Sequence, residues 1–110
     1  MSRGSAITGL LNTVGDVVAL TLDANTIDVS YVLFGTWQAV AVFEATQDGA
    51  QWFGISATPQ SQPPSGQATQ NDQYTVAVRQ AWQATRIRLV SVVQGPVNVS
   101  IQNSVAPPNL

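Results

Sequence analysis

The chain has 110 residues, of which 45% are hydrophobic and only 9% are charged, and its net charge at neutral pH is -2. An average soluble domain has roughly 25% charged residues, so the surface of this protein must be polar but almost uncharged. Four Lys or Arg residues are too few for a nucleic-acid platform, and no stretch approaches the about 20 consecutive apolar residues that cross a membrane, so we expect partners of neither kind.

Period-two alternation of apolar and polar residues dominates the chain, and helical spacing is nowhere sustained. The first fifteen residues, which include a segment rich in Ser and Gly, precede the first predicted strand, and we expect them to form an N-terminal arm, 1–15, outside the folded domain. The predicted strands, in chain order, are 16–22, 26–34, 37–46, 51–57, 73–79, 85–93 and 97–102.

Two of these strands differ in their expected surroundings. In 26–34, the alternate residues from Ile27 to Leu33 form one apolar face, and the other face is only partly apolar. In 37–46, both faces carry apolar residues, with Phe43 on one side and Val42 on the other. This second pattern predicts a central strand or one that a neighbouring segment covers.

Turn-forming residues separate the strands. Asp48-Gly49 is a strong hairpin signal, and Gly95-Pro96 predicts a turn before the last strand. The segment 58–72 is rich in Gln, Ser and Pro, and a loop of this length is typically functional or mobile. The last residues, 103–110, include Pro107-Pro108, and we expect them to form a C-terminal tail.

These elements predict one all-β domain, because the chain is long enough for a single core. Six or seven short strands joined by turns are typical of a sandwich or a barrel. We expect an antiparallel two-sheet β-sandwich over 16–102, of the jelly-roll type.

The sequence contains few of the residue types that catalytic sites commonly use. It has no His and no Cys, which removes the commonest bases, the thiol nucleophile and most zinc chemistry. Three of its carboxylates, Asp23, Asp48 and Asp72, stand in turn contexts that favour Asp for backbone reasons. We therefore expect no enzymatic activity, no cofactor and no metal ion.

The three tryptophans have two interpretations. Trp37 and Trp52 are best interpreted as core and hairpin cover, because Trp37 shares a strand face with small residues. Trp82 stands beside glutamines at the start of a strand. For Trp82, packing and a stacking platform for a sugar remain equally open.

Arg86 and Arg88 alternate with apolar residues and therefore point to one face of their strand. We expect them to pair within the chain, with Asp28 or Glu44. The alternative is that they bind carboxylates of a partner.

The segment GTWQAVAVFEATQDGAQW at 35–52, with YTVAV at 74–78 and RIRL at 86–89, resembles a pattern of small phage virion β-sandwich domains. That pattern reads GTW…V.FE.S.DG..W, followed by Y.V.V and..RVR strands. The resemblance covers roughly residues 16–102, and Thr46 stands where the pattern usually has serine.

The resemblance implies a structural part of a phage particle. We expect a head decoration (cement) protein that binds the major capsid protein, forms homo-oligomers on the capsid surface and stabilises the head. The alternative is a carbohydrate-binding or adaptor module of a tail tip or fibre, with a glycan as ligand. Because the sequence begins at Met1, we expect a stand-alone protein rather than a module of a long fibre, which favours decoration.

In the decoration hypothesis, the arm and the tail lie along neighbouring subunits of the shell. The residues expected at that interface are Ser2, Arg3, Ile7, Leu10, Leu11, Val105, Pro107, Pro108 and Leu110. The residues expected to contact a further ligand or partner are Trp82, Arg86 and Arg88.

Overall fold

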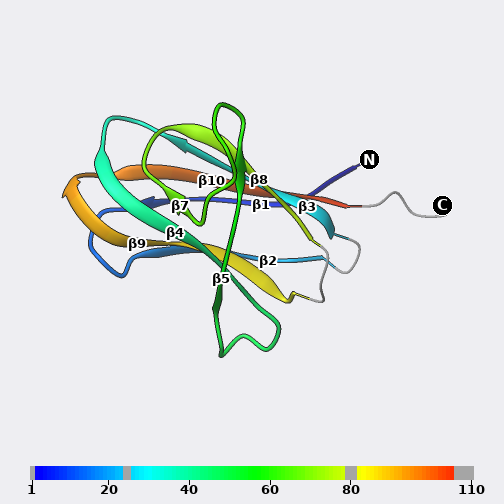
Figure 1. Cartoon of the computed structure of the whole chain (residues 1–110). Coiled ribbons are helices and arrows are strands. Elements are labelled where there is room, and N and C mark those ends of the chain that lie inside the picture. Colours follow the sequence, from blue (N-terminus) through cyan, green and yellow to red (C-terminus); the bar gives the residue numbers. More distant parts are fainter. Residues whose placement is uncertain (1, 24–25, 79–81, 106–110) are drawn as a thin grey trace.

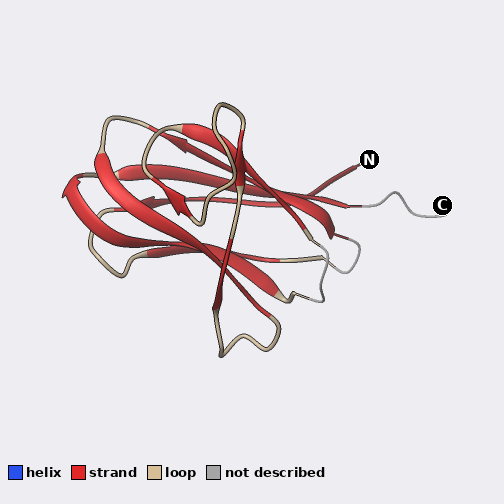
Figure 2. Ribbon diagram, viewed as in Figure 1, coloured by secondary structure: helices blue, strands red, loops and turns tan. Residues whose placement is uncertain are grey.

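The computed structural model describes residues 2–23, 26–78 and 82–105, and within these ranges it contains strands and loops but no helix (Figures 1 and 2). Accordingly, this part of the chain holds no helix that could cross a membrane. The strands are β1 (Ser2–Leu11), β2 (Val17–Thr21), β3 (Thr26–Phe34), β4 (Gln38–Thr46), β5 (Phe53–Ile55), β6 (Thr58–Pro59), β7 (Gln67–Ala68), β8 (Asp72–Ala77), β9 (Ala84–Gln94) and β10 (Val97–Val105).

The strands form two antiparallel sheets that pack face to face. Sheet A has the order β1-β10-β3-β8-β6, and sheet B has the order β2-β9-β4-β5 with β7 paired to β4. The pairs are nested, since β1 pairs with β10, β2 with β9, β3 with β8 and β4 with β5. This nesting is the wrapping of a jelly roll. The predicted fold class, an antiparallel two-sheet sandwich in a single domain, is confirmed.

The predicted N-terminal arm, 1–15, is wrong, because most of it is a strand. β1 pairs with β10 from Ser2 opposite Val105 to Leu11 opposite Val97. It forms the outermost strand of sheet A and supplies the first strand of the jelly roll. The sandwich therefore begins at β1 rather than at residue 16.

This strand was not predicted because a glycine takes one of the inward positions that usually carry apolar side chains. Ile7, Gly9 and Leu11 have the same parity along β1, and Leu11 is fully buried. A Cβ atom at Gly9 would lie only 2.8 Å from a methyl carbon of Val18 in β2. The close approach of the two edge strands thus requires glycine where the alternation would otherwise show an apolar side chain.

The predicted tail, 103–110, begins too early. β10 continues to Val105, and Asn103 is fully buried. The Asn103 amide nitrogen donates a hydrogen bond of 3.0 Å to the Asp23 carboxylate. These residues belong to the sandwich, and residues 106–110 lie outside the described residues.

The proline-rich connection, 58–72, is folded rather than a long open loop. Its β6 pairs with β8 in sheet A, and its β7 pairs with β4 in sheet B. Pro59 and Ala68 are buried. The connection therefore closes the sandwich at the edge opposite β1 and β2.

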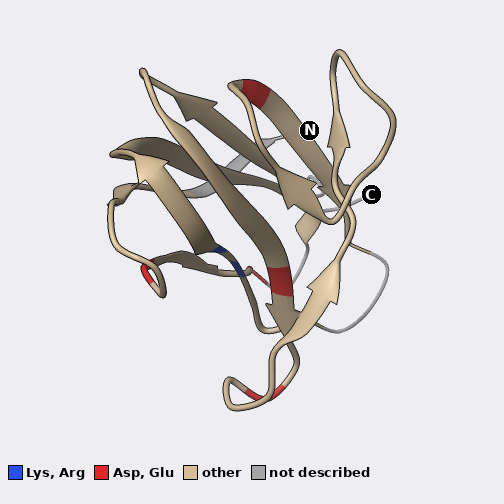
Figure 3. Ribbon diagram, turned by 60° about the vertical axis from the view of Figure 1, so that its left-hand side comes forward, with Lys and Arg blue, Asp and Glu red and all other residues tan. Residues whose placement is uncertain are grey.

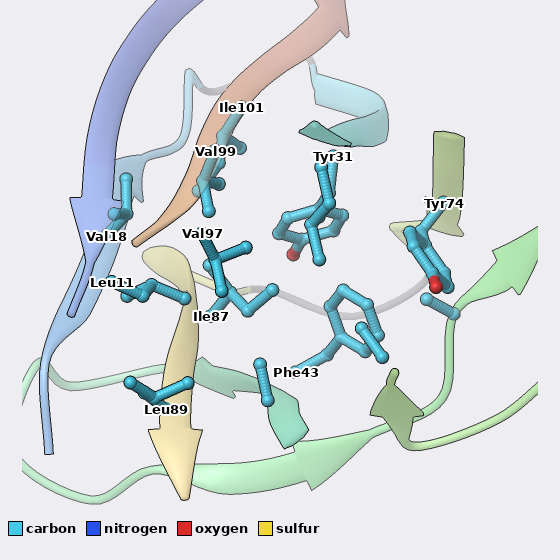
Figure 4. Packing of buried hydrophobic residues seen from close by; sticks show 14 of the residues in the cluster. Leu11, Val18, Tyr31, Phe43, Tyr74, Ile87, Leu89, Val97, Val99 and Ile101 are labelled. Atoms are coloured by element: carbon cyan, nitrogen blue, oxygen red, sulfur yellow. The ribbon is translucent and has the colours of Figure 1, made fainter. Parts of the chain in front are cut away.

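The core lies between the two sheets and centres on three aromatic rings. The Phe43 ring of sheet B lies 5.0 Å from the Tyr31 ring and 5.1 Å from the Tyr74 ring of sheet A, between centroids (Figure 4). These distances are typical of favourable aromatic pairs. Aliphatic residues of β1, β2, β3, β4, β8, β9 and β10 pack around these rings, including Leu11 and Ile87.

Candidate functional site

The N-terminal residues that were predicted to contact neighbouring subunits differ in exposure. Leu11 is fully buried in the chain's own core, so its assignment to an interface is wrong. Ile7 is 40% exposed and Leu10 is 56% exposed. Of these three residues, Ile7 and Leu10 remain available to a partner.

The other predicted interface residues belong to the same sheet edge or fall outside the described residues. In the β1–β10 ladder, Ser2 stands opposite Val105 and Arg3 opposite Ser104, so these residues pair within the chain. Val105 is partly buried. The remaining predicted residues, Pro107, Pro108 and Leu110, lie outside the described residues.

Three exposed apolar side chains gather on the outer face of sheet A. Leu10 of β1, Val32 of β3 and Phe34 of β3 are 56%, 37% and 48% exposed. In register, Asn98 lies between Leu10 and Phe34, and Ser100 lies beside Val32. We call the three apolar residues the sheet A patch. The residues between them are polar and uncharged, which suits a protein contact better than a solvated surface.

The outer face of sheet B carries the predicted arginines. The Glu44 Oε1 atom accepts hydrogen bonds from Arg86 Nε at 2.8 Å and from Arg88 Nε at 3.1 Å, and Glu44 Oε2 accepts one from Arg88 Nη2 at 3.1 Å. The Trp52 ring lies over Arg86, with 4.0 Å between the Arg86 Cζ atom and the ring centroid. Glu44 is only 8% exposed beneath these groups. The predicted pairing within the chain is therefore confirmed, with Glu44 as the partner.

This cluster shifts the acidity of its members. The hydrogen bonds from Arg88, followed by the effect of Arg86, lower the pKa of Glu44 despite its burial. The hydrogen bond to Glu44 likewise raises the pKa of Arg88. Both shifts favour the charged forms. Arg86 and Arg88 are thus engaged in holding β4 and β9 together rather than free to recruit a carboxylate.

A pocket is lined by residues at one end of sheet B. At this end the β4–β5 turn projects beyond the sandwich (Figure 1). The volume of the pocket is about 310 Å³, and it is open to solvent on one side. Trp82 packs partly against the core and forms one wall. Phe53 is 64% exposed and forms another. The described lining residues are Ala45, Gln47, Phe53, Gly54, Ile55 and Trp82.

Other acidic side chains serve the turns, as their sequence contexts indicate. Asp48 Oδ1 accepts the backbone N–H groups of Ala50 at 2.8 Å and Gln51 at 2.9 Å, and these bonds lower its pKa. Charged positions are sparse along the ribbon (Figure 3). Within the described ranges, no group of three or more His, Cys, Asp or Glu residues is arranged to hold a metal ion.

Comparisons with known proteins agree with this geometry at the level of the fold. No protein-family model matches the sequence, and neither does any curated protein sequence. The chain is similar in structure to the SPBc2 prophage-derived protein YomS, whose crystal structure superimposes with a TM-score of 0.72. The two share 12% sequence identity, and the match covers 94% of this chain and 97% of that one. At this identity the likeness establishes a shared fold.

Sequence reasoning found some of these surface residues and missed others. It singled out Leu10 and Trp82, but not Phe34 or Phe53. The signal for Phe34 was present, since it is apolar on the more polar face of its strand. Phe53 gave no such signal, because its register opposite buried Ala45 is that of a core residue.

Proposed function

We propose that this chain is a structural protein of a phage particle, namely a head decoration protein that binds the major capsid protein and stabilises the head. The observation that carries this proposal is the sheet A patch. Leu10, Val32 and Phe34 are exposed apolar side chains on the outer sheet face, and the residues between them in the ladder are uncharged. Such a composition matches the centre of protein interfaces, where charged residues are depleted.

The fold supports a place in a virion. The structural likeness to a prophage-derived protein extends over 94% of this chain, and jelly rolls recur in viral capsid proteins. The corrected position of β1 changes the expected mechanism. Because β1 is part of sheet A, the contact with the shell is made by a rigid sheet face rather than by a flexible arm.

Low charge favours such a role. A net charge of -2 on 110 residues leaves little repulsion between copies and little charge to desolvate on contact. Many copies bound at equivalent sites on a shell sum weak individual contacts into a stable coat. In this proposal the protein is not an enzyme, forms homo-oligomers on the capsid surface and resides on the head of the virion.

The test begins with purified particles that carry this protein. Labelling by a specific antibody in electron micrographs locates the chain on the head or on the tail. The protein is then removed, and the release of DNA on heating is followed with an intercalating dye. We expect stripped heads to open at a lower temperature, and added wild-type protein to restore the original temperature.

A matched pair of variants tests the surface itself. Phe34→Ser removes the largest side chain of the sheet A patch, whereas Phe53→Ser removes an exposed phenylalanine from sheet B. We expect Phe34→Ser to fail in restoring the stripped heads and Phe53→Ser to succeed. Stripped heads that open no earlier, or a Phe34→Ser variant that restores them fully, contradict the proposal. Labelling confined to the tail would favour the tail module instead.

A further inference from the structure

The pocket on sheet B has the size and construction of a small-ligand site. Its volume of about 310 Å³ lies at the lower end of the range for ligand pockets, about 300–1,000 Å³. It belongs to sheet B, whereas the sheet A patch lies on the outer face of the other sheet. The contact with the capsid and the pocket are therefore separate surfaces, and this inference goes beyond the proposed function.

The aromatic walls of the pocket are unequally buried. Trp82 is partly covered by the core, so the protein holds it in place without a ligand. Phe53 lies opposite Ala45 in the β4–β5 ladder, and cross-strand neighbours share a face of the sheet. Ala45 is buried, yet Phe53 is 64% exposed. The Phe53 ring thus stands on the inner side of sheet B at a point where the sandwich opens, and it contributes area to the pocket rather than to the core.

A backbone hydrogen bond links the Trp82 wall to the start of the β4–β5 turn, which carries Gln47. The Gln83 N–H, next to Trp82, donates a hydrogen bond of 2.7 Å to the Thr46 carbonyl, next to Gln47. The Thr46 hydroxyl in turn accepts the Gly49 N–H at 3.0 Å, which braces the turn that carries Gln47. These bonds order the backbone that carries Trp82 and Gln47, and preorganisation of this kind lowers the entropic cost of binding.

The chemistry of the lining selects the ligand. None of the six lining residues that the structure describes is charged, so these six offer a charged ligand no ion pair in return for its lost hydration. The lining combines two aromatic faces with the Gln47 amide, which both donates and accepts hydrogen bonds. A hexopyranose ring has an apolar C–H face and a rim of hydroxyl groups. It matches this combination, whereas a purely aliphatic ligand would leave the amide unpaired.

We propose that this pocket binds a hexopyranose ring of a neutral glycan. The ring stacks on Trp82 and Phe53, and a hydroxyl group bonds to the Gln47 side chain. This site gives the alternative carbohydrate-binding prediction for Trp82 a physical location, and it adds Phe53 and Gln47, which the sequence did not indicate.

The test uses saturation-transfer NMR on the full chain, with methyl glucopyranoside, methyl galactopyranoside and N-acetylglucosamine as probes, followed by an array of neutral glycans. We expect at least one neutral sugar to bind. Phe53→Ala should weaken binding about tenfold, and Gln47→Ala should also weaken it. Because Phe53 is largely exposed, its variant should keep the fold, which circular dichroism checks. Phe34→Ala, which removes an exposed phenylalanine from sheet A, should bind as wild type does.

Three outcomes would overturn this proposal. The first is the absence of binding across the neutral sugars and the array. The second is binding that survives both Phe53→Ala and Gln47→Ala. The third is a loss of binding in Phe34→Ala as large as in Phe53→Ala. A negative result for sugar binding would not affect the test of head decoration, because that test depends on Phe34 and is expected to tolerate Phe53→Ser.

Discussion

Two groups of aromatic side chains lie close to each other in this fold and behave differently. The inner group, Tyr31, Phe43 and Tyr74, joins the two sheets, and all three residues are buried. The rim group comprises Trp52, Phe53 and Trp82. Phe53 is mostly exposed, Trp82 is half-buried in a pocket wall and Trp52 lies over an arginine.

The difference shows that position in the sandwich, rather than residue type or strand parity, decides what an aromatic ring does. Phe43 and Phe53 come from the paired strands β4 and β5 and lie only two ladder positions apart, since Phe53 is opposite Ala45. Phe43 is covered by sheet A, whereas Phe53 lies beyond that cover. The inner rings should therefore contribute to stability, and the two rim rings that line the pocket, Phe53 and Trp82, should contribute to binding.

The largest effect should come from the centre of the inner group. Phe43→Ala removes contacts with both Tyr31 and Tyr74 and leaves a cavity between the sheets. We expect the free energy of unfolding to fall by about 3–5 kcal/mol, as measured by urea denaturation. A loss below about 1 kcal/mol would show that the two sheets are held together elsewhere. It would contradict the stabilising role of the inner aromatic group.

Removal of the charge at Glu44 should have the next largest effect. Glu44→Gln removes the negative charge between Arg86 and Arg88 and replaces one acceptor oxygen with an NH2 donor, and charge-assisted hydrogen bonds of this kind contribute about 2 kcal/mol. Urea denaturation of the single variants Glu44→Gln and Arg88→Gln and of the double variant measures the coupling. Additive effects of the two substitutions would contradict the interaction.

The fold was largely predictable from the sequence, whereas its edges and surfaces were not. The alternation in 26–34 reproduces β3 at its observed bounds, because buried strands impose a strict period of two. β1 was missed because Gly9 occupies an inward position that the approach of Val18 requires. Strand parity placed Arg86 and Arg88 on one face and left Asp28 or Glu44 as their partner, and the register of β4 with β9 decides for Glu44. The exposure of Phe53 depends on which segment covers it, and local sequence does not contain that information.

Stability should also fall in acid, and Glu44 should account for part of the loss. The pKa values of Glu44, Asp16, Asp48 and Asp72 are lowered in the folded state by their hydrogen bonds. The unfolded chain therefore binds protons first as the pH falls below about 4.5, and stability present above that pH is lost towards the folded pKa values. Melting temperatures measured between about pH 6 and about pH 3 should drop less in Glu44→Gln than in wild type. Parallel curves for the two proteins would exclude a contribution from Glu44.

The smallest effect should come from Phe53, and its size tests most directly whether the inner and rim aromatic rings differ in role. Phe53→Ala removes a ring that is 64% exposed, so we expect a change in unfolding free energy within about 0.5 kcal/mol. Trp52→Ala is the matched control from the same rim. It removes the stack on Arg86 and should cost about 1 kcal/mol. If Phe53→Ala proved as destabilising as Phe43→Ala, the Phe53 ring would belong to the core, and the pocket that it lines would be a packing defect rather than a binding site.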